Sequence, residues 1–114
     1  MHDDEQLLFV YGSLMNPAKR VELLGHPIEA SPARLLGYQR GQKRYHFVVA
    51  QAGAITDGAI LEGLDSRDLA ILDAYEEVPR LYTRERIEVL TADSSRLECW
   101  IYLPTKWAKS ESEK

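Results

Sequence analysis

The feature that most constrains the fold is a short apolar run, Leu7-Leu8-Phe9-Val10, which leads directly into Tyr11-Gly12-Ser13-Leu14. A short run rich in Phe and Val predicts a buried strand. Gly12 allows a sharp turn or a close approach to a ligand, because it carries no side chain. The segment therefore predicts a strand that delivers free backbone N–H groups to one end of a sheet, where they can bind a carboxylate or an oxyanion. An ordinary strand-to-helix turn is the alternative.

The length and composition are those of an ordinary globular protein. The 114 residues suffice for one domain with one core. The 14 basic and 18 acidic residues give a net charge of −4, and no basic face is evident, which argues against nucleic acid as a main partner. We expect a single domain over residues 1–114, with loose tails at about 1–5 and 109–114.

Several classes of site are disfavoured by the cysteine, histidine and apolar patterns. Cys99 is the one cysteine, so no intramolecular disulfide can form, and a reducing, cytoplasmic location is consistent with this. Cys99 alternates with Leu97 and Ile101, which predicts a small buried hydrophobe and not a nucleophile. The histidines have no metal-ligand spacing. The acidic N-terminus is unlike a signal peptide and no apolar run is long enough to span a membrane, so we expect no membrane partner.

Strand patterns outnumber helix patterns along the chain. We expect strands at Gln6–Tyr11, Ala33–Gln39, Lys43–Ala50, Gly58–Leu64, Leu81–Leu90 and Leu97–Leu103. Arg40-Gly41-Gln42 is a plausible hairpin turn, Glu29–Pro32 a connector and Gln51–Asp57 a loop. Hairpins outnumber crossovers, so the predicted class is α+β with a mixed or barrel-like sheet.

Two segments have the end signals of helices. Pro17–Leu24 has Asn16 at the N-cap and Gly25 as a stop. The clearest helix runs from Asp65, which can cap it, to about Glu76.

The second helix supplies the candidate catalytic residue. At about 100° per residue, Leu69, Leu72 and Tyr75 share one side of this helix. Glu76 projects on that same side, where an acid is costly unless it is paired or protonated. Burial raises a carboxyl pKa, which suits a general acid/base that works near neutral pH. The alternative is that the helix has ended by Glu76, which is then solvated.

The strand after this helix adds two further candidates. Tyr82 and Arg84 share one face of that strand, so Arg84 can pair with a nearby acid and Tyr82 can donate from its hydroxyl. Purely structural roles are the alternative for both. The sequence has no G-x-S-x-G elbow, H-E-x-x-H motif, P-loop or G-x-G-x-x-G motif. A reaction here is therefore expected to use one carboxylate and backbone donors, without a metal, a cofactor or a covalent nucleophile.

Together these residues resemble the gamma-glutamylcyclotransferase-like family, which includes AIG2-like proteins and gamma-glutamylamine cyclotransferases. The resemblance rests on Phe9–Leu14, Leu36-Gly37-Tyr38, and Leu72–Glu76 followed by Tyr82-Thr83-Arg84. These blocks span nearly the whole chain. The resemblance implies a small α+β fold built round a mixed β-barrel with flanking short helices, in which the glutamate and the Tyr-Gly-Ser-Leu loop line one cavity.

The resemblance also implies an activity. Glu76 is the implied catalytic acid/base, and Tyr11, Gly12, Ser13 and Leu14 hold the substrate, with Tyr82 as a further contact. The implied partner is a small gamma-glutamyl compound, whose α-amine attacks its own side-chain carbonyl, forms pyroglutamate and releases an amine. A non-catalytic small-molecule-binding or interaction protein on the same scaffold is the second hypothesis.

Two positions depart from the family pattern. Glu77 stands where a glycine is common, and His46-Phe47-Val48 lacks the proline often found in that strand. Both departures bear on the shape of the implied substrate cavity.

Overall fold

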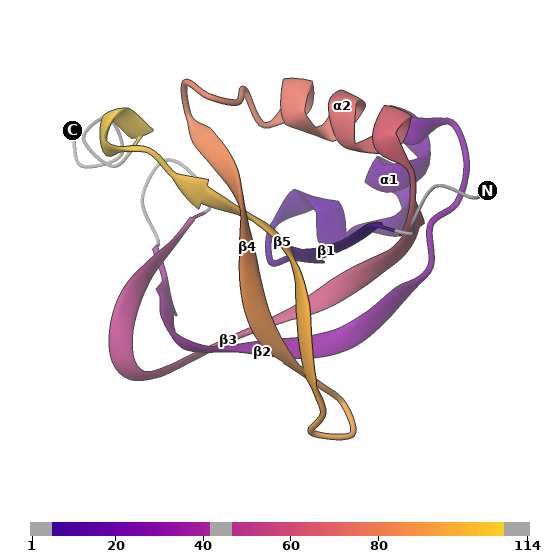
Figure 1. Cartoon of the computed structure of the whole chain (residues 1–114). Coiled ribbons are helices and arrows are strands. Elements are labelled where there is room, and N and C mark those ends of the chain that lie inside the picture. Colours follow the sequence, from indigo (N-terminus) through magenta and orange to yellow (C-terminus); the bar gives the residue numbers. More distant parts are fainter. Residues whose placement is uncertain (1–5, 42–46, 109–114) are drawn as a thin grey trace.

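The strands close into a barrel, and the helices gather on one side of it (Figure 1). The computed structural model describes residues 6–41 and 47–108. In this part of the chain the strands are β1 (Gln6–Val10), β2 (Ala30–Arg40), β3 (Val48–Leu64), β4 (Tyr82–Thr91) and β5 (Arg96–Pro104). The helices are the 3₁₀ turn η1 (Ser13–Met15), α1 (Pro17–Leu24) and α2 (Ser66–Tyr75). Residues 106–108, at the end of the described part, are helical as well. The expected α+β class with a mixed barrel is confirmed.

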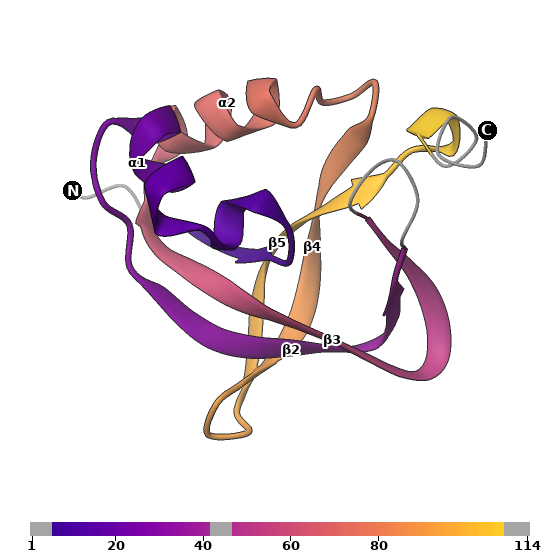
Figure 2. The same ribbon diagram turned by 180° about the vertical axis from the view of Figure 1, so that it is seen from behind.

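The strand order around the barrel is β1-β3-β2-β4-β5. Neighbouring strands are antiparallel, except that β1 closes the barrel by pairing in parallel with β5, with Leu8 opposite Trp100. The long hairpin of β2 and β3 curves beneath the helices, and the hairpin of β4 and β5 crosses it (Figures 1 and 2). The parallel pairing places the end of β1, where the Tyr11–Leu14 segment begins, beside the last strand.

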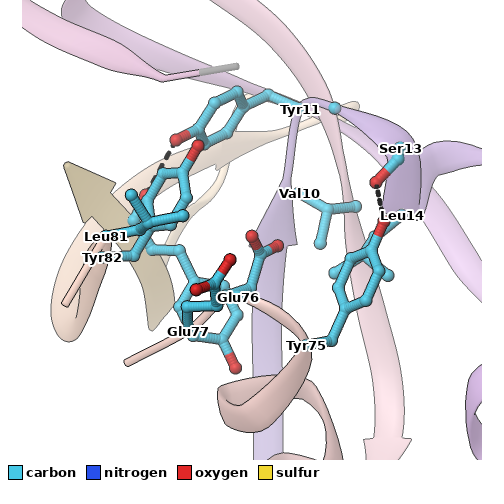
Figure 3. A pocket seen from close by; sticks show the side chains of 11 residues that line it. Val10, Tyr11, Ser13, Leu14, Tyr75, Glu76, Glu77, Leu81 and Tyr82 are labelled. Carbon is cyan, nitrogen blue, oxygen red and sulfur yellow. Dashed lines mark hydrogen bonds between the residues drawn. The ribbon is translucent and has the colours of Figure 1, made fainter. Parts of the chain in front are cut away.

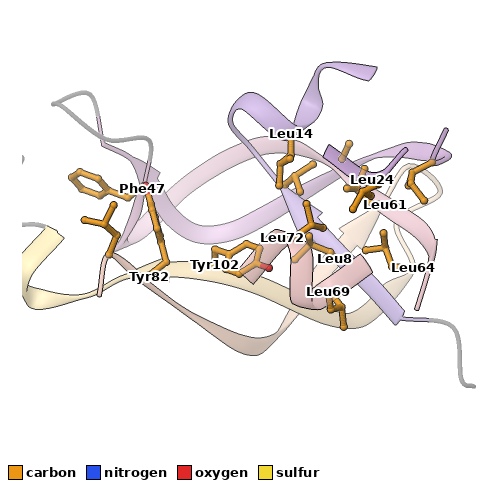
Figure 4. Packing of buried hydrophobic residues seen from close by; sticks show 14 of the residues in the cluster. Leu8, Leu14, Leu24, Phe47, Leu61, Leu64, Leu69, Leu72, Tyr82 and Tyr102 are labelled. Carbon is orange, nitrogen blue, oxygen red and sulfur yellow. The ribbon is translucent and has the colours of Figure 1, made fainter. Parts of the chain in front are cut away.

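Side chains of the strands are buried in two clusters. The inner cluster draws on all the strands of the barrel and includes Phe9, Leu35, Ile60, Val89, Cys99 and Ile101. The outer cluster packs the helices onto the barrel and includes Leu8, Leu14, Leu24, Leu61, Leu64, Leu69 and Leu72 (Figure 4). Strand β1 supplies both clusters, because alternate residues face opposite sides. This double burial accounts for its continuous apolar run.

Helix α1 begins and ends where its sequence indicates. The side chain of Asn16 accepts a hydrogen bond from the Ala18 N–H at 2.9 Å. Gly25 ends the helix with φ of +80°, a conformation that glycine adopts without steric cost. Both expectations for this helix are confirmed.

Helix α2 begins with a reciprocal capping box. The Asp68 N–H donates to the Asp65 carboxylate at 2.8 Å, and the Asp65 N–H donates to the Asp68 carboxylate at 3.1 Å. The helix ends at Tyr75, so Glu76 is its C-cap residue. The Glu76 N–H still donates to the Leu72 carbonyl at 2.9 Å, so the backbone stays helical up to that point.

The expected connector Glu29–Pro32 is wrong, because β2 already begins at Ala30. Residues 30–32 pair with residues 59–61 of β3. Strand β4 pairs with β2 only at Ala33 and Arg34. Pro32 therefore lies just outside this pairing, and its missing N–H costs β4 no hydrogen bond.

The expected loop Gln51–Asp57 is also wrong, because β3 runs through it. Ile55 pairs with Leu36, and the pairing register then shifts before Tyr38. Gly53 has φ of +83° in this irregular stretch. Residues 51–57 therefore belong to an irregular part of β3. The prediction failed because their amino-acid composition resembles that of a loop.

The expected strands Lys43–Ala50 and Gly58–Leu64 are not separate, because both fall on β3, which begins at Val48 in the described residues. Three other strands agree closely with expectation. Expected strands Gln6–Tyr11, Leu81–Leu90 and Leu97–Leu103 differ from β1, β4 and β5 by about one residue at their ends. The hairpin turn at Arg40-Gly41-Gln42 lies partly outside the described residues, and the tails at 1–5 and 109–114 lie wholly outside them. No helix within residues 6–41 and 47–108 has the length and apolar character needed to cross a membrane.

Candidate active site

A cavity of about 280 Å³ opens where the end of β1 faces the end of α2 (Figure 3). Its lining is Val10, Tyr11, Gly12, Ser13, Leu14, Tyr75, Glu76, Glu77, Leu81, Tyr82 and Tyr102. The structure therefore brings the Tyr11–Leu14 loop, Glu76 and Tyr82 to one cavity, whereas the further candidate Arg84 does not line it.

Glu76 is partly buried at the end of α2, and its carboxyl group points into this cavity (Figure 3). Burial raises the pKa of this carboxyl from 4.5 to about 7. The helix does end before Glu76, but the side chain stays against the cavity. A carboxyl with a pKa near neutrality can both accept and release a proton under ordinary conditions.

The turn after Glu76 positions the next wall of the cavity. Glu77 has φ of +56°, in the left-handed region that favours glycine. The side chain of Glu77 is exposed and pairs with Arg80, and its carbonyl accepts from the Leu81 N–H at 2.9 Å. Glu77, where a glycine is common in the family pattern, is therefore itself part of the cavity lining beside Glu76.

Turn η1 carries the opposite wall. The Met15 N–H donates to the Gly12 carbonyl at 3.0 Å, and the Asn16 N–H donates to the Ser13 carbonyl at 3.1 Å. The first N–H groups of such a turn have no partner within it. The Ser13 and Tyr75 hydroxyl groups are 2.8 Å apart, so a hydrogen bond joins the loop to α2 (Figure 3).

Two buried tyrosines of the cavity have their protons committed to protein acceptors. The Tyr11 hydroxyl donates to the Tyr102 carbonyl at 2.8 Å, and the Tyr102 hydroxyl donates to Asp73 at 2.7 Å. Burial raises the pKa of both phenols above the ordinary value. Both side chains are therefore neutral near pH 7, and their oxygens keep lone pairs with which to accept hydrogen bonds.

Arg84 pairs with Asp73 and not with the candidate catalytic acid. Its Nε lies 2.8 Å from Asp73 Oδ1, and its Nη2 lies 3.1 Å from Oδ2. The acid with which Arg84 pairs is therefore Asp73, one helical turn before Glu76. Neither Arg84 nor Asp73 lines the cavity.

Sequence reasoning did not single out Tyr102 and Tyr75 as site residues. Tyr102 lines the cavity together with Tyr82 of the neighbouring strand, and it lies opposite Arg84 in the pairing of β4 and β5. That relationship is long-range, and no local pattern carries it. The helical periodicity places Tyr75 on the apolar face of α2 and does not indicate a cavity residue. Its position directly before Glu76 is the one local signal that could have suggested a place in the site.

Within residues 6–41 and 47–108, no group of three or more His, Cys, Asp or Glu side chains is arranged to hold a metal ion.

Comparison with known proteins identifies the family. The family model described as "Gamma-glutamyl cyclotransferase, AIG2-like" matches residues 8–114. The chain belongs to this gamma-glutamyl cyclotransferase, AIG2-like family. The resemblance noted in the sequence is thereby confirmed.

Members of the cyclotransferase family with similar sequences come from distant organisms. A Methanocaldococcus jannaschii protein whose name includes gamma-glutamylcyclotransferase is 28% identical over 99 residues, which cover 84% of this chain and 45% of that protein. The AIG2-like protein C of Arabidopsis thaliana is 32% identical over 91 residues, which cover 77% of this chain and 52% of that protein. The chain thus spans about half the length of these two relatives.

Solved structures share the cyclotransferase fold. A protein of Arabidopsis thaliana solved in solution superimposes with a TM-score of 0.82 at 27% identity, covering 95% of this chain and 74% of that one. A solved gamma-glutamyl cyclotransferase gives a TM-score of 0.78 at 19% identity, covering 90% of this chain and 68% of that one. The second likeness concerns the fold alone.

Proposed function

We propose that this protein closes the gamma-glutamyl group of a small amine or peptide substrate to pyroglutamate (5-oxoproline) and releases the amine. Glu76 is the general acid/base of this proposal, and no cofactor takes part. The observation that carries it is the Glu76 carboxyl, with a pKa of about 7, in a cavity whose other wall is the Tyr11–Leu14 loop. Membership of the family supports the same reaction class.

The reaction needs a proton carrier more than a protein nucleophile. The free α-amine of the substrate attacks the γ-carbonyl carbon, and one proton leaves the attacking nitrogen for the Glu76 carboxylate as the new C–N bond forms. The same proton passes to the leaving nitrogen as the old C–N bond breaks, so a neutral amine departs. Ring closure is intramolecular, so the main task of the cavity is to hold the folded conformer.

The cavity walls suit the two ends of such a substrate. In the proposal, backbone N–H groups between Gly12 and Leu14 bind the substrate carboxylate or the developing oxyanion. The lone pairs of the Tyr11 and Tyr102 oxygens accept hydrogen bonds from the substrate amine, and the Tyr82 side chain closes the cavity beside them.

A screen of gamma-glutamyl amines and peptides for pyroglutamate release tests the proposal. Release of pyroglutamate by the wild type, with loss of that release in Glu76→Gln, is the expected result. Binding of gamma-glutamyl compounds in a calorimeter, without release from any of them, favours the second hypothesis of a non-catalytic binding protein.

A further inference from the structure

Arg20 is a buried cation directly behind the loop of the cavity. It extends from α1 and is only 5% exposed. Its Nη1 donates to the Leu14 carbonyl at 2.9 Å and to the Met15 carbonyl at 3.0 Å. Its Nε is buried and has no hydrogen-bond partner. None of the ion pairs found within residues 6–41 and 47–108 includes Arg20.

A buried guanidinium without a carboxylate partner is energetically costly. Two carbonyl dipoles satisfy part of its hydrogen-bonding capacity but do not cancel its charge. An apolar side chain of similar length fills such a site without that cost. The position of Arg20 therefore calls for a role in which the charge itself matters.

The geometry links this charge to the cavity. The carbonyl groups of Leu14 and Met15 accept hydrogen bonds from Arg20, and residues 12–14 of the same segment line the cavity, whereas Arg20 itself does not. The acids of the cavity wall, Glu76 and Glu77, come from the opposite side. The cavity thus lies between a buried cation behind one wall and carboxyl groups on the other, and in such surroundings charge interactions are screened less than in water.

We propose that Arg20 is a positioning residue for ligand binding, which fixes the Tyr11–Leu14 loop and makes that wall of the cavity select a carboxylate. The ligand class that fits is a zwitterionic α-amino acid group, with its carboxylate toward the loop and its amine toward Glu76. The choice of an α-amino acid group as the ligand rests on the proposed function. The selection of an anion by the loop does not depend on that function.

The test compares one anionic and one neutral probe of nearly the same shape, 5-oxoproline and 5-oxoprolinamide. Calorimetry gives the ratio of their affinities for the wild type, Arg20→Gln and Arg20→Lys. The glutamine keeps an N–H donor for the loop carbonyls and loses the charge, whereas the lysine keeps both. Arg67→Gln, which removes an exposed arginine from the first turn of α2, is the matched control.

We expect the wild type and Arg67→Gln to prefer 5-oxoproline by about tenfold or more. Arg20→Gln should lose most of that preference, and Arg20→Lys should keep it within about threefold. Circular dichroism and thermal unfolding establish that each variant is folded. If Arg20→Gln does not fold, the affinity ratio of the two probes in Arg20→Lys decides: a ratio within about threefold of the wild type supports the role of Arg20, and a lost ratio contradicts it.

Three results overturn the inference: a wild type with no preference for the anion, an unchanged ratio in folded Arg20→Gln, or a lost ratio in folded Arg20→Lys. Equal weakening of both probes in Arg20→Gln leaves the ratio unchanged and shows a merely structural role. Absence of pyroglutamate release, with the preference for 5-oxoproline intact, removes the proposed reaction and leaves the role of Arg20 standing.

Discussion

Asp73 receives a forked pair of hydrogen bonds from Arg84, at 2.8 and 3.1 Å. Asp73 belongs to α2 and Arg84 to β4, so the pair ties the end of the helix to the barrel. Tyr102 of β5 adds a third hydrogen bond to the same carboxylate at 2.7 Å. Because Glu76 follows one helical turn after Asp73, this network fixes the proposed acid/base relative to the cavity wall.

Replacing Asp73 with Asn should therefore lower turnover without removing a reacting group. We expect a loss of about tenfold to a hundredfold in kcat, because a small displacement of a proton carrier is costly. The free energy of unfolding should fall by about 1–2 kcal/mol, since the ion pair is only partly buried. Steady-state kinetics and urea unfolding measure the two effects.

A matched control for Asp73→Asn is Glu98→Gln, which breaks the exposed pair with Arg86, at 2.9 Å. That control should change neither kcat nor stability appreciably. Wild-type kcat in Asp73→Asn would show that the network does not position Glu76.

Cys99 should be structural. It is fully buried in the inner cluster beside Phe9 and Ile101, and burial raises the pKa of its thiol to about 11. Cys99→Ala should therefore keep its activity and lose about 1 kcal/mol of stability, as small core truncations do. Complete loss of pyroglutamate release by a folded Cys99→Ala protein would instead indicate thiol chemistry.

Local patterns were enough to predict the parts of the fold that rest on local physics. Asn16 and Gly25 bound α1 through capping, which depends on neighbouring residues alone. The apolar run before Gly12 and the helix before Glu76 are also local features. The loop predicted at 51–57 failed because a bent strand and a loop share the same small, exposed residues.

The remaining contacts of the site depend on pairings distant in the sequence. Tyr102 of β5 and Arg84 of β4 are opposite each other in the paired strands, and both side chains reach Asp73 of α2. Arg20 lies in a short helix, and its buried side chain donates to the Leu14 and Met15 carbonyls of η1. No periodicity within a single element carries either relationship.

The pH dependence of stability should report on the burial of Glu76. Its pKa is about 7 in the folded protein against an ordinary 4.5, so between these values the folded protein holds a proton that the unfolded chain has released. The stabilising contribution of this group is complete below about pH 4.5 and is lost as the pH rises through about 7. Glu76→Gln does not undergo this loss.

Urea unfolding at a series of pH values measures this effect. At pH 8 the Glu76→Gln variant should exceed the wild type in unfolding free energy by up to about 3 kcal/mol, and near pH 4 the two should be nearly equal. A difference that stays constant across this range would show that the Glu76 carboxyl is solvated in the folded protein.

Turnover by Glu76→Gln is the direct test of the proposed proton carrier. The change keeps the volume of the side chain and removes the basic oxygen. Turnover should fall by roughly two to four orders of magnitude, the usual share of general acid–base catalysis. In the wild type, kcat/KM should rise as the pH passes through about 7, because the carboxylate form accepts the proton from the substrate amine. Binding of a gamma-glutamyl compound should survive in Glu76→Gln, because the Tyr11–Leu14 backbone is untouched.

Pyroglutamate release and calorimetric binding, measured in parallel on the wild type and Glu76→Gln, separate the possible outcomes of this test. Equal rates in the two proteins would remove Glu76 from the mechanism. A wild-type rate that does not change between about pH 5 and 9 would show that the ionisation of Glu76 does not control the reaction. Loss of binding together with turnover would mean that Glu76 holds the substrate amine as a charge partner, and the proton would then need another carrier.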